Sequence, residues 1–339
     1  MIQDRRGTGN KSRILGALLA FLSIYFLAKS AILTGCILLV ASIHLLYMGH
    51  VLSQPPINNP ARFILRFRIM SPARPVMVCI GDSLIHGRTS DDWIPKVPFL
   101  VSEKMKFDCP QVSDFMDPVW IVNAAQNGIT SWIAHTEKIQ QAVSCYPDYI
   151  LLMIGTNDVL SMYSPLASVN AAVTWSLPET CKMSVLERNL ISMLDSLAER
   201  SPSTEVAVCT IPPLGEDLAS PANRLVKEAN EIIRNIVESR EAARVTVLDV
   251  NERLQSEITK GSTGKKLPIE LAALLMAFMA PLHYYLGIPW QMLSGIVGNR
   301  VLFDGMHLNE VGGDIVAGVV TDWLFTKNIH KAIAVKQFS

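Results

Sequence analysis

Two separated blocks of the sequence hold the residue types that a serine hydrolase needs. Ser83 stands in Gly81-Asp82-Ser83-Leu84, and His307 stands in Asp304-Gly305-Met306-His307. A serine hydroxyl attacks an acyl carbon effectively only when a base removes its proton. The three-residue spacing of Asp304 and His307 can place carboxylate and imidazole on one side of a turn, so that Asp304 holds Nδ1 and Nε2 meets Ser83. Each block alone also fits an ordinary turn.

Two further blocks offer hydrogen-bond donors for the negative charge that develops on a carbonyl oxygen. Asn157 lies in Gly155-Thr156-Asn157-Asp158, where its side-chain amide could donate to an oxyanion. Gly128 ends the segment Asn123-Ala124-Ala125-Gln126-Asn127-Gly128, and its N–H can approach a ligand because no Cβ intervenes. Taken singly, Asn157 could simply close its turn, and Gly128 is typical of a plain turn residue.

Short apolar, β-branched runs alternate with stretches of helical spacing from residue 75 onward. The runs predict strands at 76–80, 119–122, 149–154, 205–211 and 245–250. Helices are predicted over 131–144, 184–200 and 221–240, the second opened by a capping box of Ser184 and Glu187. This alternation predicts a parallel sheet covered on both faces, with chemistry at the carboxyl ends of its strands.

In their order along the sequence, the four blocks, which contain Ser83, Gly128, Asn157 and His307, resemble those of the SGNH (GDSL-type) hydrolase family over residues 76–325. The resemblance implies a flavodoxin-like three-layer α/β/α sandwich and ester hydrolysis that needs no cofactor and no metal. It implies that Ser83 is the nucleophile, that His307 is the base, and that Asp304 orients the histidine. It also implies an oxyanion hole made of the Ser83 N–H, the Gly128 N–H and the Asn157 side chain.

The sequence departs from the family pattern in two places. Ala125 stands where the second block often has glycine, although Gly128 is retained. The interval from Asn157 to Asp304 is also long, with the excess at 159–183 and 257–300.

The N-terminal region predicts a membrane anchor at residues 1–53. Residues 14–48 carry a single charge, Lys29, which separates two apolar segments. The second segment, extended to Leu52, is long enough to span a bilayer once, and a hairpin turning near Lys29 is the alternative. A cleaved signal peptide is the competing interpretation. Basic residues lie on both sides of the anchor, so they do not fix the direction of a single span, whereas they fit a hairpin with both ends on the cytoplasmic side.

The rest of the chain divides into a Pro/Arg-rich linker at 54–75 and a hydrolase domain at 76–328, with an apolar insertion at 257–300. The insertion includes the uncharged stretch Leu271–Asn299. We expect this stretch to form two short helices interrupted near Pro281. It would lie beside Ser83 as an acyl-chain wall or a membrane-dipping lid, and an additional core helix pair is the alternative.

Composition fits a membrane-attached globular enzyme. Apolar residues make up 50% of the 339, charged residues 18%, and the formal net charge is zero, which does not suggest a nucleic-acid partner. The six cysteines show no zinc spacing. Membrane attachment and the apolar insertion favour a lipase-like enzyme, so we expect hydrolysis of a lipid or another apolar acyl ester. An O-acetyl-glycan esterase, a membrane-anchored binding module without activity, and thioester hydrolysis or acyl transfer are the alternatives. The sequence does not indicate an oligomeric state.

Overall fold

The structure is a computed structural model that describes residues 8–28, 32–67, 74–108, 118–240, 244–261 and 267–338. Its centre is a five-stranded parallel sheet in the order β2-β1-β3-β4-β5. The strands are β1 (Val76–Gly81), β2 (Trp120–Asn123), β3 (Tyr149–Met153), β4 (Glu205–Cys209) and β5 (Val245–Leu248). All five lie where the sequence predicts strands, and their order is that of flavodoxin-like folds.

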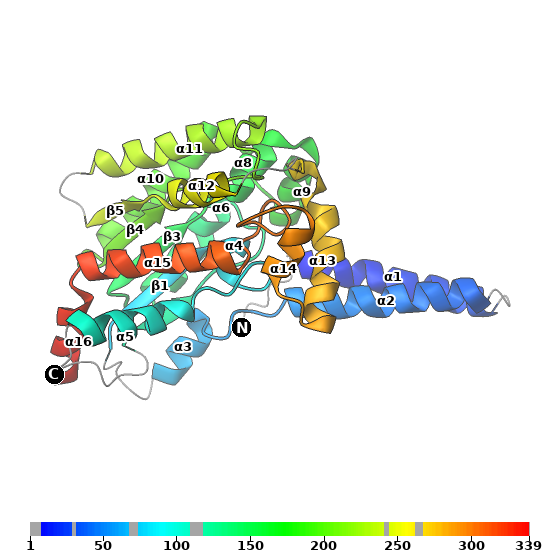
Figure 1. The fold of residues 1–339 in the computed structure, drawn as a ribbon, viewed down its shortest axis with the longest axis horizontal. Helices are drawn as coiled ribbons and strands as arrows, with labels where there is room; N and C mark the ends of the chain where they lie inside the picture. The colour runs from blue at the N-terminus through cyan, green and yellow to red at the C-terminus, as the bar shows by residue number, and fades with distance from the viewer. Residues whose placement is uncertain are drawn as a thin grey trace.

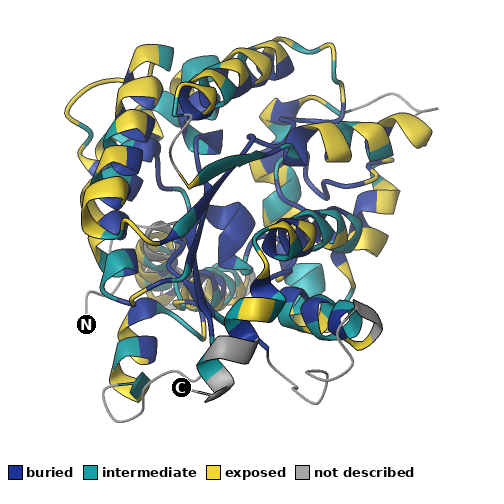
Figure 2. Ribbon diagram, turned by 90° about the vertical axis from the view of Figure 1, so that its left-hand side faces the viewer, coloured by how far each residue is buried: buried dark blue, intermediate teal, exposed yellow. Residues whose placement is uncertain are grey.

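Helices cover both faces of this sheet and give the predicted three-layer sandwich. Side chains alternate along β1, so Val76, Val78 and Ile80 face one helix layer while Met77 and Cys79 face the other. The first layer contains α6 (Ser131–Ile133), the π-helix Ala134–Lys138, α7 (Ile139–Val143), α10 (Met183–Arg200) and α11 (Pro221–Glu238). The second contains α5 (Lys96–Asp108), α12 (Val250–Lys260), α15 (Glu310–Thr326) and α16 (Ile329–Phe338). Figure 2 shows the buried strands between helices whose outer surfaces are exposed.

The N-terminal region forms a helical hairpin rather than one isolated helix. α1 (Thr8–Ala28) and α2 (Ile32–Leu52) lie side by side and project from one end of the α/β domain (Figure 1). Arg13 near the start of α1 contacts His50 near the end of α2, with Arg13 Nη2 and His50 Nδ1 3.0 Å apart. The two helices are therefore antiparallel, and both outer ends of the hairpin lie at the domain.

The segment predicted as a linker packs partly on the domain. It contains α3 (Pro60–Phe67), whose Phe63 is buried in the core beside the sheet. The N–H of Asn123 at the end of β2 donates to the carbonyl of Asn58 at 2.8 Å, so the chain before α3 extends the edge of the sheet. This corrects the expectation that residues 54–75 lie wholly outside the core. Residues 68–73 lie outside the described part of the chain.

The uncharged stretch forms two helices, but the interruption is not at Pro281. α13 (Ala272–Leu286) passes through Pro281, and α14 (Trp290–Ile296) follows after Gly287-Ile288-Pro289. Proline lacks only one N–H, so a single missing hydrogen bond does not end a helix that is packed on its neighbours. α13 ends where Gly287 takes a left-handed conformation (φ 68°) and its N–H donates to the carbonyl of His283.

The C-terminal helix continues past the predicted domain end at residue 328. Ile329 and Ile333 of α16 are buried in the second core layer, and Lys336 pairs with Asp148 at 2.6 Å. α16 is therefore part of the α/β domain.

Candidate active site

Ser83 lies at the tight turn that joins β1 to α4 (Ser83–His86). Gly81 is required there because an added Cβ would lie 2.3 Å from the carbonyl oxygen of Met153 on the neighbouring strand. Asp82 caps the short helix, its carboxylate accepting from the Leu84 N–H at 3.0 Å. The turn thus presents Ser83 at the carboxyl end of β1, next to the ends of β2 and β3.

His307 lies in a tight loop between α14 and α15. The loop is closed by a bridge between Leu302 and Leu308 and by a hydrogen bond from the Phe303 N–H to the His307 carbonyl at 2.9 Å. Inside it, one oxygen of Asp304 accepts from the Met306 and His307 N–H groups at 2.9 and 2.8 Å. The loop backbone therefore holds the Asp304 carboxylate in place independently of its contact with the imidazole.

The three side chains form one hydrogen-bonded chain. The second Asp304 oxygen lies 2.7 Å from His307 Nδ1, and Nε2 lies 3.0 Å from Ser83 Oγ. All three residues are buried, with Asp304 only 1% exposed. With a proton on Nδ1, the imidazole donates to Asp304 and Nε2 can accept the Ser83 proton. This arrangement can activate a hydroxyl for attack on an acyl carbon.

Asn157 and Gly128 lie on two segments next to the Ser83 turn, the start of α8 and the loop after β2. Asn157 is the second residue of α8 (Thr156–Tyr163). Its Nδ2 donates to Asp82 Oδ2 at 3.3 Å and to the Ile129 carbonyl at 3.0 Å. Gly128 has φ 77°, a conformation that side chains disfavour, and its carbonyl accepts from Trp175 Nε1 at 2.7 Å. The Asn157 amide thus joins the Ser83 turn to the Gly128 loop. A substrate oxyanion would accept from the same N–H that donates to Asp82 over the longer of the two distances.

Replacing Asn157 tests its predicted place in the oxyanion hole. Asn157→Ala is expected to lower kcat by about 10²–10³ with little change in KM, because an oxyanion donor acts mainly in the transition state. Steady-state kinetics on a nitrophenyl ester would measure both constants. Asn235→Ala, at an exposed position of α11, is the matched control. An unchanged kcat with only a raised KM would exclude Asn157 from this role.

Burial shifts the protonation of two side chains beside Ser83. It raises the pKa of Asp82 to about 6, so this residue is a carboxylate at neutral pH and can accept from Leu84 and Asn157. Burial, together with the charges of Arg88 and Lys138, lowers the pKa of His86 to about 3. His86 is therefore neutral near Ser83 and adds no positive charge to the site.

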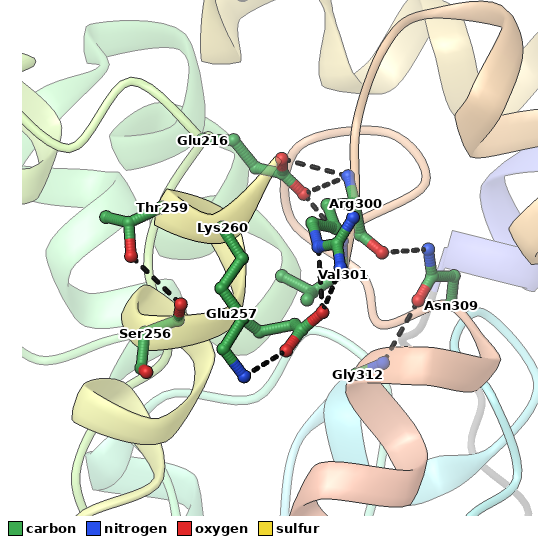
Figure 3. Close-up of polar contacts among 9 residues, drawn as sticks. All are labelled: Glu216, Ser256, Glu257, Thr259, Lys260, Arg300, Val301, Asn309 and Gly312. Atoms are coloured by element: carbon green, nitrogen blue, oxygen red, sulfur yellow. Dashed lines mark hydrogen bonds and ion pairs between the residues drawn. The ribbon is translucent and has the colours of Figure 1, made fainter. Parts of the chain in front are cut away.

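Glu216 holds the base of the His307 loop, and the sequence did not single it out. It lies in the segment after β4, and its buried carboxylate accepts from the N–H groups of Arg300, Val301 and Leu302 at 2.7, 2.7 and 3.1 Å. Asn309 completes the support, because it accepts from the Gly312 N–H and donates to the Arg300 carbonyl (Figure 3). The segment after β4 and the start of α15 thus fix the position of the loop that bears His307.

Asp158, the last residue of the third block, anchors the helix that follows Gly128. Its two oxygens accept from the Ser131 N–H at 2.9 Å and from the Ser131 hydroxyl at 2.6 Å. Asn189 of α10 donates to the same hydroxyl at 2.9 Å. The block therefore serves two purposes: Asn157 faces the Ser83 turn and Asp158 fixes the neighbouring loop.

Among the described residues, no group of three or more His, Cys, Asp or Glu side chains is arranged to hold a metal ion. The chemistry that the geometry offers is that of the Ser83, His307 and Asp304 side chains.

One protein family and several solved structures are similar to this chain. Residues 79–265, more than half of the chain, match the GDSL-like Lipase/Acylhydrolase family. None of the curated proteins matches the chain. Similar solved structures include Axe2, an acetylxylan esterase from Geobacillus stearothermophilus, at 14% identity over 73% of this chain and 92% of that chain, with a TM-score of 0.47. Another is a lipase/acylhydrolase from Enterococcus faecalis, at 15% identity over 75% and 96% of the two chains, with a TM-score of 0.46.

The family match includes the Ser83 turn, the Gly128 loop and the Asn157 block, which are three of the four blocks found in the sequence. The chain therefore belongs to the GDSL-like lipase/acylhydrolase family and is a carboxylic-ester hydrolase.

Proposed function

We propose that this protein is a membrane-anchored serine hydrolase that cleaves lipid or other apolar acyl esters through an acyl-enzyme on Ser83. The observation that carries the chemical part is the chain of contacts from Asp304 to His307 at 2.7 Å and from His307 to Ser83 at 3.0 Å. This is hydrogen-bond distance at both steps, in an order that suits proton removal from the hydroxyl.

In the first half of the reaction, Ser83 Oγ attacks the ester carbonyl carbon while His307 Nε2 takes the hydroxyl proton. The carbonyl oxygen becomes an oxyanion, which the N–H groups of Ser83 and Gly128 and the Asn157 amide would stabilise. His307 then gives its proton to the leaving alcohol, and the C–O bond of the ester breaks. Asp304 accepts from Nδ1 throughout and stabilises the imidazolium.

In the second half, a water molecule replaces the alcohol. His307 accepts a proton from this water, whose oxygen attacks the acyl carbon of the Ser83 ester. Collapse of the second tetrahedral intermediate releases the carboxylic acid and returns the proton to Ser83 Oγ through His307.

The membrane part of the proposal rests on the hairpin of α1 and α2. The apolar part of α2, Thr34–Leu52, has 19 residues, which corresponds to about 28 Å and is long enough to cross a bilayer, whereas the apolar part of α1, Arg13–Ile24, is shorter. Exposed side chains on both helices are apolar, among them Phe21 and Val40. In a hairpin, the basic residues before the first apolar segment and those after the second lie on the same side of the bilayer. This agrees with the preference of such residues for the cytoplasmic side. In this proposal residues 1–53 anchor the enzyme, and the domain from residue 76 carries out hydrolysis.

A chain-length series of nitrophenyl esters tests the substrate preference of the full chain in lipid nanodiscs. We expect hydrolysis with kcat/KM at least about tenfold higher for octanoate than for acetate, because each buried methylene contributes about 0.8 kcal/mol. Faster hydrolysis of acetate would favour an acetyl esterase instead. Failure to hydrolyse any carboxylic ester would contradict the proposed activity.

A further inference from the structure

α13 and α14 expose an apolar surface on the side of the domain from which the hairpin projects. We name this surface the α13–α14 face. It consists of the exposed side chains of Leu274, Phe278, Tyr285, Leu286, Met292 and Ile296. Phe278 is 73% exposed, and residues 271–299 include no Asp, Glu, Lys or Arg. Exposed apolar patches of this kind mark surfaces that bind a partner or a membrane.

The two sides of α13 have different surroundings. Leu274, Phe278 and Tyr285 follow one another at spacings of four and seven, so they share one side of the helix. Met279 and Ala280, on the other side, are buried against the domain. The helix is thus held in place by one apolar side, while Leu274 and Phe278 on its second apolar side are exposed.

The α13–α14 face is continuous with the hairpin. Tyr285 stacks on Tyr47 of α2 with ring centroids 5.0 Å apart, and its hydroxyl lies 3.1 Å from His44 Nδ1. At the end of α2, Met48 and Leu52 join Met279, Ala280, Trp290, Leu293 and Phe303 in one buried cluster. Any membrane that surrounds the hairpin therefore comes directly to this face.

The depth of this contact along α2 indicates where the face would lie. The Arg13 and His50 pair marks the polar end of the hairpin, and His44 is six residues before His50 on α2, which is about 9 Å along the helix. α13 runs across the direction of the hairpin instead of along it (Figure 1). A helix lying across the membrane normal at this depth is in the boundary between headgroups and acyl chains.

The same elements contact three of the four segments that bear the candidate site residues, those of Ser83, Gly128 and His307. Tyr284 Oη donates to the Arg88 carbonyl, in the loop that follows Ser83 and α4. Asn127, which precedes Gly128, donates from Nδ2 to the Leu52 carbonyl at 3.1 Å, at the last residue of α2. Hydrogen bonds thus connect α13 to the loop after Ser83, and the end of α2 to the Gly128 loop.

The third connection is a column of stacked rings that ends at the base. The His283 ring lies 3.9 Å from the Trp290 ring, which lies 4.0 Å from the Phe303 ring, both pairs with an angle of 15°. Phe303 in turn stacks on His307 at 5.9 Å. The loop that holds His307 therefore packs directly on α13 and α14.

We infer that the α13–α14 face lies in the interface of the leaflet that the hairpin enters, and that Ser83 receives its substrate, an acyl ester of a bilayer lipid, from this leaflet. The inference rests on the proposed function, to which it adds a second membrane contact and the source of the substrate. α13 lies in the interface and does not cross the bilayer. Its buried side is fixed to the domain, and Ser83 and His307, which precede and follow it, are 3.0 Å apart between Oγ and Nε2.

Fluorescence quenching in the full chain tests the position of this face without using activity. The starting variant has Cys36, Cys109 and Cys181 replaced by alanine, since Cys79, Cys145 and Cys209 are buried. A cysteine at one chosen position then carries a nitrobenzoxadiazole label in vesicles of phosphatidylcholine that contain a nitroxide-labelled phosphatidylcholine. Phe278→Cys reports on α13 and Val40→Cys on the hairpin. Tyr146→Cys is the control, because Tyr146 is exposed and precedes β3 at the opposite end of the sheet.

We expect strong quenching at positions 40 and 278 and none at position 146. Quenching at position 40 without quenching at 278 would overturn the inference while leaving the membrane anchor intact, and a second copy of the chain covering α13 would give this result. No quenching at position 40 would contradict the membrane anchor itself. The two claims therefore fail in distinguishable ways.

A kinetic measurement in the same vesicles tests the source of the substrate. The double variant Leu274→Ser/Phe278→Ser is expected to lower kcat/KM for umbelliferyl oleate dissolved in the vesicles about tenfold or more, and to change hydrolysis of water-soluble nitrophenyl acetate less than about twofold. Tyr146→Ser should change neither. Equal losses on both esters, with an unaltered circular dichroism spectrum, would show that α13 is only a core element and would overturn the inference.

Discussion

Ser83→Ala is expected to lower ester hydrolysis by on the order of 10⁴–10⁶ and to leave the protein folded. Removal of the nucleophile of a serine hydrolase leaves only the contribution of binding and of the oxyanion donors. The Ser83 hydroxyl contacts His307 Nε2, while the turn itself is held by Gly81 and the Asp82 cap. Loss of the hydroxyl should therefore not disturb the β1–α4 turn. Initial rates on nitrophenyl octanoate in nanodiscs would measure the effect.

The control for this variant is Ser144→Ala, at the C-cap of α7, whose hydroxyl donates to the Gln140 carbonyl within the same helix. It should hydrolyse the ester at the wild-type rate. Circular dichroism and a thermal melt would show that both variants are folded. If folded Ser83→Ala kept a tenth of the wild-type rate, a different nucleophile would have to act.

His307→Ala is expected to have an effect of the same order, because Ser83 without a base is a weak nucleophile. The double variant Ser83→Ala/His307→Ala should be no slower than either single variant, since the two side chains act as one unit. Comparison of the three residual rates would measure this non-additivity. His330→Ala, on α16 at the opposite end of the sheet, is the matched control.

Two results would contradict this pairing. Multiplicative losses in the double variant would indicate that Ser83 and His307 act independently. A His307→Ala variant that keeps most of its activity would indicate that another group removes the Ser83 proton.

The sheet was predictable because its strands are short, continuous apolar runs that stand between helices of clear amphipathic spacing. The runs at 149–154 and 205–211 are such cases, and β3 and β4 lie within them. The blocks that contain Ser83 and Asn157 could be recognised equally well, because each directly follows a predicted strand. The pairing of Ser83 with His307, 224 residues apart, followed from the need of a serine nucleophile for a base and from the resemblance to a family, because no local pattern joins the two blocks.

Local rules failed where tertiary contacts decide the outcome. α10 begins at Met183 after Lys182, with no side-chain cap, so Ser184 and Glu187 do not form the expected capping box. Pro281 does not interrupt α13 because packing on the domain outweighs one lost hydrogen bond. Phe63 lies in a Pro- and Arg-rich segment whose composition suggests a linker, and its burial depends on contacts with the sheet edge.

The supports of the site were also hidden from sequence. Glu216 follows β4 in a loop with no motif, and only the fold brings its carboxylate to the backbone of residues 300–302. That the two N-terminal helices form a hairpin is shown by contacts such as Arg13 with His50. Two apolar segments separated by a single lysine are compatible with one span or a hairpin.

The most direct test of the central claim is identification of the residue that reacts with a fluorophosphonate. Attack by an activated serine forms an Oγ–phosphorus bond and releases fluoride, and peptide mass spectrometry of the full chain locates the adduct. We predict that the adduct lies on the peptide containing Gly81-Asp82-Ser83 and that His307→Ala prevents its formation. An adduct on another serine, or no adduct in an enzyme that hydrolyses esters, would contradict the assignment of Ser83 as the nucleophile.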